Sequence, residues 1–280
     1  MFRKYTFESN KEGKHILILG AVHGNEVAGT IAQNAIISQI EKGEINLIQG
    51  MVTFIPVVNV EAQNHDTRFI DVNLNRVVCH HDDPQNNEEK IANELIKEID
   101  NCDIMLDLHS THCKEDEPFA FIDYPNSDNM ELLSLIPVKK ALAGWPDIYK
   151  GQAINDFCTE RYANQKGKIG ITVECGYHKS EDAIELAKKS ILNVLRYFGI
   201  IEEEDNKKYN PEVVNLCSFV IKKDNGNLAC NYKHMSEIKK GEVIAIYDNG
   251  EKEISPIDGF IIMPNHEALI GSEWFYLGRI

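Results

Sequence analysis

Two histidines and a glutamate of this sequence occupy positions where they could bind a metal ion. His23 and Glu26 lie three residues apart in the segment AVHGNE, and His109 directly follows the apolar segment CDIMLDL. Two imidazoles and one carboxylate are a known ligand set of catalytic zinc, which keeps a further position open for water. The H-x-x-E spacing alone is a weak signal, because a histidine and an exposed glutamate at a helix start have the same spacing.

The surrounding elements favour the metal interpretation. Residues 15–20, HILILG, form a short apolar run that is typical of a buried strand. Apolar residues then recur from Glu26 to Ile40 at helical spacing, which predicts a helix packed on the sheet. His23 and Glu26 are therefore expected at a strand-to-helix turn. Another predicted strand, residues 102–108, ends on His109.

A third carboxylate, Glu174, lies at the end of the predicted strand 169–175, where catalytic loops of an α/β fold gather. Hydrolysis of an amide needs a base that deprotonates water and an acid that protonates the leaving amine, and one carboxylate can do both. A salt bridge at the strand end is the alternative interpretation of Glu174. Cys175 is expected to face the core, because adjacent strand residues point to opposite faces.

Arginines are dense in the segment DTRFIDVNLNR, although the chain is acidic as a whole. The planar guanidinium groups of Arg68 and Arg76 suit a carboxylate or a developing oxyanion. In the alternative interpretation, these arginines pair with Asp66 and Asp71 on a solvated loop.

Four sequence blocks, GAVHGNE, DVNLNR, DLHSTH and TVECG, resemble those of the succinylglutamate desuccinylase and aspartoacylase family, in the family's order. This family belongs to the zinc carboxypeptidase-like metallohydrolases, and the resemblance covers about residues 15 to 200. It implies that His23, Glu26 and His109 bind zinc, one ion per chain. It also implies that Glu174 is the general base and acid.

The resemblance further implies that Asn75 and Arg76 hold a substrate carboxylate, while Arg68 polarises the scissile carbonyl. One position departs from the family, which usually has Asp-x-Asn-Arg where this chain has Asn73-Leu74-Asn75-Arg76. If that Asp orients a zinc-bound imidazole, Asn73 does so more weakly, because an amide carries no charge. Asp71 or Asp107 are the candidates to replace it.

The predicted fold is α/β, with a mixed twisted sheet flanked by helices as in zinc carboxypeptidases, and a small C-terminal all-β domain. The acidic run at 202–205 is interpreted as a linker between a catalytic domain, 1–202, and a β domain, 203–280, that is structural or covers the pocket. Other expected elements are a strand at 51–58, helices at 88–99 and 180–197, and hairpin turns at 224–226 and 248–250.

The formal net charge of −15 and the pI near 5.1 disfavour nucleic acid and anionic membranes as partners. No signal peptide or membrane span is evident, and the seven cysteines contain no C-x-x-C pair, so a cytoplasmic protein with reduced thiols is expected. The oligomeric state is open, a homo-oligomer included. Four further histidines are interpreted as solvated or as neighbours of the site: His80, His81, His112 and His178.

The function that follows is zinc-dependent hydrolysis of the amide bond of a small, carboxylate-bearing N-acyl amino acid. N-acetylaspartate and N-succinylglutamate both fit, and the sequence does not choose the acyl group or the amine. The alternatives are a metallocarboxypeptidase acting on peptides and a non-catalytic zinc-binding or ligand-binding protein. A tail tyrosine that the family uses for substrate has no clear counterpart, and Tyr276 is the candidate.

Overall fold

The computed structural model describes residues 1–150, 157–202 and 207–280 of the chain. Within these residues, eleven strands form one mixed sheet in the order β1-β3-β2-β4-β7-β5-β6-β8-β14-β13-β10, and three more form a second sheet, β12-β11-β9. The strands of the large sheet are Tyr5–Glu8 (β1), Met51–Ile55 (β3), His15–Gly20 (β2), Ile104–Thr111 (β4), Ile169–Tyr177 (β7), Phe119–Phe121 (β5), Lys140–Ala143 (β6), Glu212–Ile221 (β8), Glu273–Arg279 (β14), Gly259–Ile262 (β13) and Ser236–Ile238 (β10). Those of the small sheet are Lys252–Ile254 (β12), Val243–Tyr247 (β11) and Gly226–Leu228 (β9).

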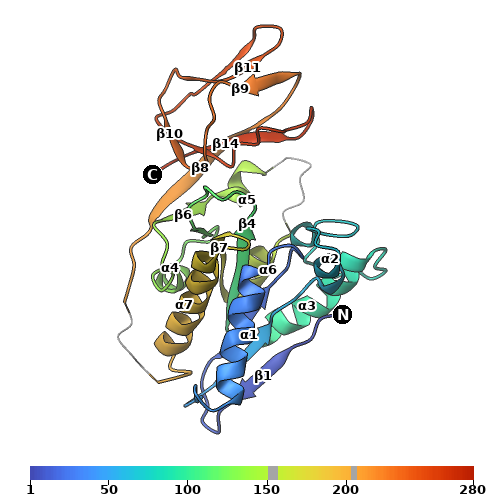
Figure 1. Ribbon diagram of the computed structural model, residues 1–280, viewed down its shortest axis with the longest axis vertical. Helices are drawn as coiled ribbons and strands as arrows, with labels where there is room; N and C mark the ends of the chain where they lie inside the picture. Colours follow the sequence, from blue (N-terminus) through green and yellow to red (C-terminus); the bar gives the residue numbers. More distant parts are fainter. Residues whose placement is uncertain (151–156, 203–206) are drawn as a thin grey trace.

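Helices cover both faces of the sheet around β2, β4 and β7. The long helices α1 (Ala28–Glu41) and α7 (Glu181–Tyr197) pack side by side on one face, and α3 (Asn87–Asn101) packs on the other face with α6 (Thr159–Gln165) (Figure 1). The shorter helical segments are Val60–Asn64 (α2), Leu74–Arg76 (η1), Ser127–Leu133 (α4) and Trp145–Ile148 (α5). In the described ranges, no helix has the length and apolar character needed to cross a bilayer.

The alternation of strand side chains explains this three-layer arrangement. In β2, Ile16 and Ile18 join the core beneath α1 and α7, whereas Leu17 and Leu19 join the core beneath α3. All four side chains are fully buried. A strand that is apolar at every position therefore requires cover on both faces, as the sequence predicted. The expected α/β fold, with a mixed sheet, flanking helices and C-terminal strands, is confirmed.

The element boundaries differ from the predictions at the site itself. β4 and β7 extend beyond Leu108 and Cys175, because their parallel pairing continues through His109 and Glu174. His109 and Glu174 therefore both lie inside strands, whereas the sequence placed them at the strand ends. The first helix begins at Ala28, so Glu26 belongs to the turn and not to the helix.

The C-terminal strands are attached to the edge of the large sheet. Residues 212–215 of β8 pair in parallel with β6, and β14, β13 and β10 follow, forming the upper part of Figure 1. The predicted linker falls largely on 203–206, which lie outside the described residues, and the independence of residues 203–280 as a domain stays a prediction.

Only one of the two predicted hairpins is present. Asp248-Asn249-Gly250 joins β11 to its antiparallel partner β12, and Gly250 has the positive φ of 88° that such a turn favours. The prediction for 224–226 is wrong, because β8 and β9 belong to different sheets. This segment carries the chain from one sheet to the other, and Gly226 is already the first residue of β9.

Candidate active site

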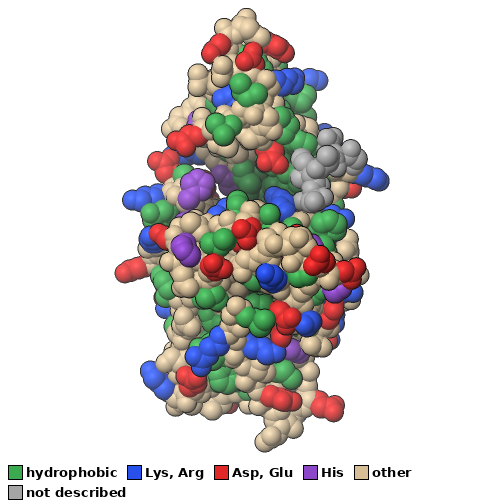
Figure 2. Space-filling view, turned by 90° about the vertical axis from the view of Figure 1, so that its right-hand side faces the viewer, with side chains coloured by type: hydrophobic (Ala, Val, Ile, Leu, Met, Phe, Trp, Pro, Cys, Tyr) green, Lys and Arg blue, Asp and Glu red, His purple; other side chains and the backbone are tan. Residues whose placement is uncertain are grey.

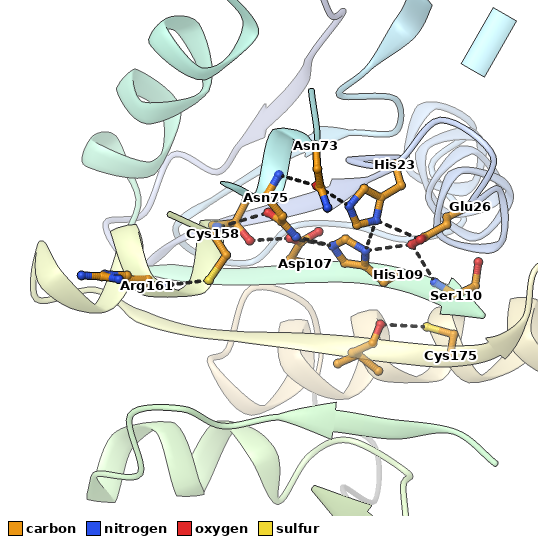
Figure 3. Close-up of polar contacts among 12 residues, drawn as sticks. His23, Glu26, Asn73, Asn75, Asp107, His109, Ser110, Cys158, Arg161 and Cys175 are labelled. Atoms are coloured by element: carbon orange, nitrogen blue, oxygen red, sulfur yellow. Dashed lines mark hydrogen bonds and ion pairs between the residues drawn. The ribbon is translucent and has the colours of Figure 1, made fainter. Parts of the chain in front are cut away.

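The side chains of His23, Glu26 and His109 meet at the ends of β2 and β4 (Figure 3). Nδ1 of His23 lies 2.9 Å from Oε1 of Glu26, and Nδ1 of His109 lies 2.8 Å from Oε2 of Glu26. The two Nδ1 atoms are 3.1 Å apart. The relative exposures are 3%, 1% and 2%, so the cluster is screened from solvent. The sequence prediction that these three residues converge is therefore matched by their positions.

The turn that carries His23 leaves no space for a side chain at Gly24. A Cβ atom on Gly24 would lie 2.2 Å from the backbone of Ala62 in α2, far inside van der Waals contact. The backbone N–H of Gly24 also donates to the carbonyl of Arg68, at 3.1 Å. The turn is thus held between α2 and the loop that follows it.

Each imidazole is oriented by a second hydrogen bond on its outer nitrogen. Nε2 of His23 lies 3.0 Å from Oδ1 of Asn73, and Nε2 of His109 lies 3.0 Å from Oδ2 of Asp107. Asn73 thus occupies the orienting position that the sequence suggested for it. The idea that Asp71 or Asp107 replaces it is wrong, because Asp107 orients the other histidine and Asp71 accepts from the backbone of Asn87.

The charges of this cluster are strongly coupled. Burial lowers the pKa of His23 to about 4, against the opposing charge of Glu26. Burial alone would also lower the pKa of His109, but the carboxylates of Asp107 and Glu26 outweigh it and hold that pKa well above its usual value. For Glu26, burial raises the pKa, yet the two histidines hold it well below its usual value. The cluster therefore favours one positive charge beside an ionised Glu26.

This donor set fits a zinc ion. Within the described residues, this is the only group of three or more His, Cys, Asp or Glu side chains that could hold a metal ion, and its ligand atoms lie no more than 4.8 Å from one another. A tetrahedral ion with bonds of about 2.1 Å separates its ligand atoms by about 3.4 Å, close to the distances in this cluster. The outer hydrogen bonds are those that fix metal-binding imidazoles. His23, Glu26 and His109 are the residues that could hold the ion.

Glu174 lies beside this cluster on β7, in register with His109 of β4. Burial raises the pKa of Glu174 to about 8, and the negative charge of Glu26 adds to the rise, while His109 and Arg68 oppose it. Its Oε2 atom is buried and has no hydrogen-bond partner in the part of the chain that the structure describes. Cys175 points to the opposite face and packs in the core, as its position in the strand predicted. A buried carboxyl with a raised pKa and a free oxygen can exchange protons.

Arg68 and Arg76 reach the same pocket from the loop after α2 and from η1. Nη1 of Arg68 donates to Oε1 of Glu26 at 2.8 Å, and the side chain is 51% exposed. Nη1 of Arg76 donates to the carbonyl of Asn75 at 2.8 Å. In the described ranges, neither arginine pairs with Asp66 or Asp71, so the solvated ion pairs considered from the sequence are not formed.

The side chain of Asn75 contacts protein groups through both its nitrogen and its oxygen, although the family resemblance assigned it to substrate binding. Its Nδ2 lies 3.4 Å from Nε2 of His109, and its Oδ1 accepts from the backbone N–H of Thr159 at 3.3 Å. It is nevertheless part of the pocket wall. Its contact with His109 adds a second neighbour to the outer nitrogen of that ring.

A hollow of about 690 Å³, counting the open solvent at its mouth, connects these residues. It opens where the C-terminal strands meet the rest of the molecule (Figure 2). We call His23, His109 and Glu174, which line the hollow, together with Glu26, which contacts both histidines, the floor of the pocket. Met263 and Tyr276 are its cover. The wall also contains six residues that were not predicted from the sequence: Phe121, Asp123, Trp145, Cys158, Glu160 and Thr172.

A family model described as the succinylglutamate desuccinylase/aspartoacylase catalytic domain matches residues 12–198 of the chain. The chain belongs to this family. The family recognised from four sequence blocks is thereby confirmed, and the match covers the part of the chain that contains the floor of the pocket.

Curated members of the family align over part of their length. A succinylglutamate desuccinylase of Shewanella piezotolerans is 45% identical over 67 residues, which are 24% of this chain and 19% of that protein. One from Vibrio vulnificus is 29% identical over 170 residues, 52% of this chain and 49% of that protein. The chain thus spans about half or less of the length of the curated relatives it matches.

Solved structures resemble the whole fold. A succinylglutamate desuccinylase/aspartoacylase from Rhodobacter sphaeroides superposes with a TM-score of 0.77 at 18% identity, covering 99% of this chain and 89% of that one. The product-bound ectoine utilization protein EutE from Ruegeria pomeroyi gives 0.78 at 20% identity, covering 99% and 88%. At these identities the likeness concerns the fold, C-terminal strands included.

Two residues beside the family's motifs take positions that the sequence left open. Nδ1 of His178 lies 2.9 Å from the hydroxyl of Ser110, whose backbone N–H donates to Glu26 at 3.1 Å, so His178 is a neighbour of the floor and is not exposed. Tyr276 lines the pocket, and its hydroxyl lies 2.6 Å from that of Tyr149. Its selection from the sequence as a tail tyrosine at the site agrees with this position.

Proposed function

We propose that this member of the family is a zinc-dependent deacylase that hydrolyses the amide bond of a small N-acyl amino acid. The observation that supports this best is the placement of a buried His-Glu-His cluster, a carboxyl of raised pKa and two arginines around one hollow. Family membership supports the same chemistry. The substrate and the metal are part of the proposal.

In this proposal, His23, Glu26 and His109 hold the zinc, and Asn73 and Asp107 fix the orientation of the two imidazoles. Bound zinc supplies Lewis acidity toward the amide carbonyl and makes water nucleophilic at neutral pH. Metal ligands must be free of protons, which agrees with the ionised state of Glu26 and the low pKa of His23. His109, whose pKa is raised by Asp107 and Glu26, would give up its proton when the ion binds.

Glu174 is proposed to move the proton. Its carboxylate takes a proton from the attacking water, and the resulting carboxylic acid gives that proton to the nitrogen of the leaving amine. Its pKa of about 8 in the metal-free chain is close to neutral, where a group can act in both directions. A neighbouring divalent cation lowers that pKa, since it favours the ionised carboxyl.

The two arginines are proposed to bind the charges of the substrate. Arg68 uses one of its five N–H donors on Glu26, and others are available for the oxyanion that forms on the scissile carbonyl. Arg76 donates to the Asn75 carbonyl and has no ion-pair partner among the described residues, so its planar fork can take a substrate carboxylate. Asn75 completes that end of the pocket.

A small substrate is favoured over a peptide. Tyr276 of β14 and Met263, directly after β13, form part of the pocket wall, so one side of the hollow is closed by the cover. An enzyme that cuts the end of a peptide needs an open cleft for the rest of the chain. The geometry therefore supports a deacylase better than a metallocarboxypeptidase.

The test measures bound zinc and the hydrolysis of a panel of N-acyl amino acids, including N-acetylaspartate and N-succinylglutamate, by wild type and Glu174→Gln. Wild type should bind about one zinc per chain. Glu174→Gln should keep zinc and lose about 10²- to 10⁴-fold in kcat, because general acid–base catalysis is removed. The best substrate then names the acyl group and the amine.

Cys175→Ala is the matched control, since it changes the neighbouring residue on the opposite face of the same strand. It should retain zinc and kcat. If wild type binds zinc but cleaves neither a member of the panel nor a peptide, the chain is a binding protein. If it binds no transition metal, the proposal is wrong.

A further inference from the structure

One fully buried carboxylate, Glu88, belongs to none of the roles above. It lies in the first turn of α3, and its relative exposure is 0%. A solvated glutamate would be expected at the start of an amphipathic helix. Burial of a carboxylate is unfavourable unless hydrogen bonds compensate for the lost water. Glu88 therefore needs hydrogen-bond donors inside the protein.

The partners of Glu88 are mostly backbone groups of the arginine loop, which we define as residues 66–76. Oε1 accepts from the N–H of Ile70 at 2.8 Å, and Oε2 accepts from those of Asp71 at 3.2 Å and Val72 at 3.4 Å. Nδ2 of Asn59 donates to Oε1 at 3.0 Å. Residues 66–73 belong to no helix or strand, so these N–H groups have no sheet or helix ladder to satisfy them.

The arginine loop carries most of the residues proposed to touch substrate or orient the metal ligands. Arg68 lies before the three N–H groups bound by Glu88, and Asn73 and Arg76 lie after them. The side chain of Arg68 is 51% exposed and contacts Glu26 through Nη1, so its packing alone contributes little to fixing the loop. The carboxylate of Glu88 reaches the loop from the protein interior and binds its centre.

Asn59 connects the same carboxylate to the turn that carries His23. Its backbone N–H donates to the carbonyl of Ala21 at 2.9 Å, and its Oδ1 caps α2 by accepting from the N–H of Ala62 at 3.2 Å. Ala62 in turn packs against Gly24. One buried carboxylate thus joins the arginine loop, α2 and, through Asn59, the turn of the metal cluster.

We infer that Glu88 is a positioning residue: its carboxylate fixes the arginine loop so that Arg68 and Arg76 face the pocket. The role in catalysis rests on the proposed function, whereas the role in ordering the loop does not. An ionised carboxylate accepts hydrogen bonds at every position, but the amide of Gln presents donors at one end. Glu88→Gln therefore keeps the shape of the side chain and loses acceptors for the loop.

The first measurement is amide hydrogen exchange of the zinc-loaded full chain, for wild type, Glu88→Gln and Glu89→Gln. Glu89 is the matched control, because it lies in the same helical turn and loses the same charge, but its Oε2 accepts from the N–H of Gln85 outside the loop. In Glu88→Gln, exchange of residues 68–76 should rise about tenfold or more while β4 is unchanged. Glu89→Gln should exchange as wild type does in both segments.

The second measurement compares the panel substrate that wild type cleaves fastest with the same compound bearing a carboxamide in place of its α-carboxylate. If Arg76 is misplaced, the preference for the carboxylate in kcat/KM should fall about fivefold or more in Glu88→Gln, and Glu89→Gln should keep it. A role limited to overall stability leaves this ratio unchanged. A wild type without activity refutes the proposed function, and the exchange measurement still tests the positioning role.

Unchanged exchange of residues 68–76 in Glu88→Gln overturns the inference, as does an unchanged substrate preference. Where Glu88→Gln does not fold, Glu88→Asp is compared in its place, since it keeps the charge and shortens the reach by one methylene. Increased exchange confined to the arginine loop in Glu88→Asp supports the inference. Increased exchange throughout β4 and β7 shows that Glu88 only stabilises the fold.

Discussion

The floor and the cover of the pocket differ in what they contribute. The floor consists of four titratable side chains on β4, on β7 and in the turn after β2, all held by hydrogen bonds or burial. The cover contributes apolar and aromatic surface from the far end of the same sheet, with Tyr276 in β14 and Met263 directly after β13. In the proposed function, the chemistry therefore depends on the buried centre of the sheet, whereas the shape of the substrate is selected at its edge.

Removal of a floor ligand should have the largest effect. His109→Ala should abolish zinc binding and hydrolysis, because two ligands remain where three are needed. His234→Ala is the control, since His234 is also a shielded imidazole, but it accepts from the backbone N–H of Met263 in the C-terminal part. Metal analysis of the purified proteins checks both. Equal zinc loss in the two variants would contradict the division between floor and cover.

Substitutions of the residues that bind the outer nitrogens of the two histidines should have smaller effects on zinc binding. The two substitutions should change the zinc affinity in opposite directions. Asn73→Asp should raise zinc affinity about tenfold, because a charged acceptor strengthens the ligand His23, and Asp107→Asn should lower it about 10- to 100-fold. Competition with a chelator measures both constants. If Asn73→Asp leaves the affinity unchanged, the amide at this position already orients His23 fully.

A change in the cover should have the smallest effect and should act on substrate binding. Tyr276→Phe removes a hydroxyl at the pocket and should raise KM about threefold to tenfold with little change in kcat and full zinc content. Tyr247→Phe is the matched control, because its hydroxyl donates to Glu253 within the small sheet, away from the pocket. A fall in kcat as large as that of Glu174→Gln would place Tyr276 with the floor.

Much of the floor could be predicted from the sequence because its residues follow or end apolar strands. HILILG must be a buried strand, and His23 follows it within one turn. Glu174 and His109 end similar segments. The cover could not be predicted in the same way, since β13 and β14 reach the pocket only through pairing with β8, which pairs with β6 in turn. No local pattern encodes those contacts.

Glu88 shows the same limit of prediction from local sequence, at a single residue. Its position in a helix was predicted from the apolar period of residues 88–99, and a glutamate in such a helix is usually solvated. Its burial depends on the loop that folds over it, 16 to 18 residues earlier in the chain. Periodicity reports which face of a helix is apolar, but not which loop covers its first turn.

The sequence by itself determined the fold class, the main strands and helices around the site, and the family, because each depends on local pattern or on short motifs. Only the tertiary structure decided that Asn73 faces His23, that Arg68 pairs with Glu26, and that Tyr276 lies across from the floor. The physical reason is distance along the chain: hydrogen bonds of about 3 Å between residues 42 to 50 positions apart depend on how the whole sheet is assembled.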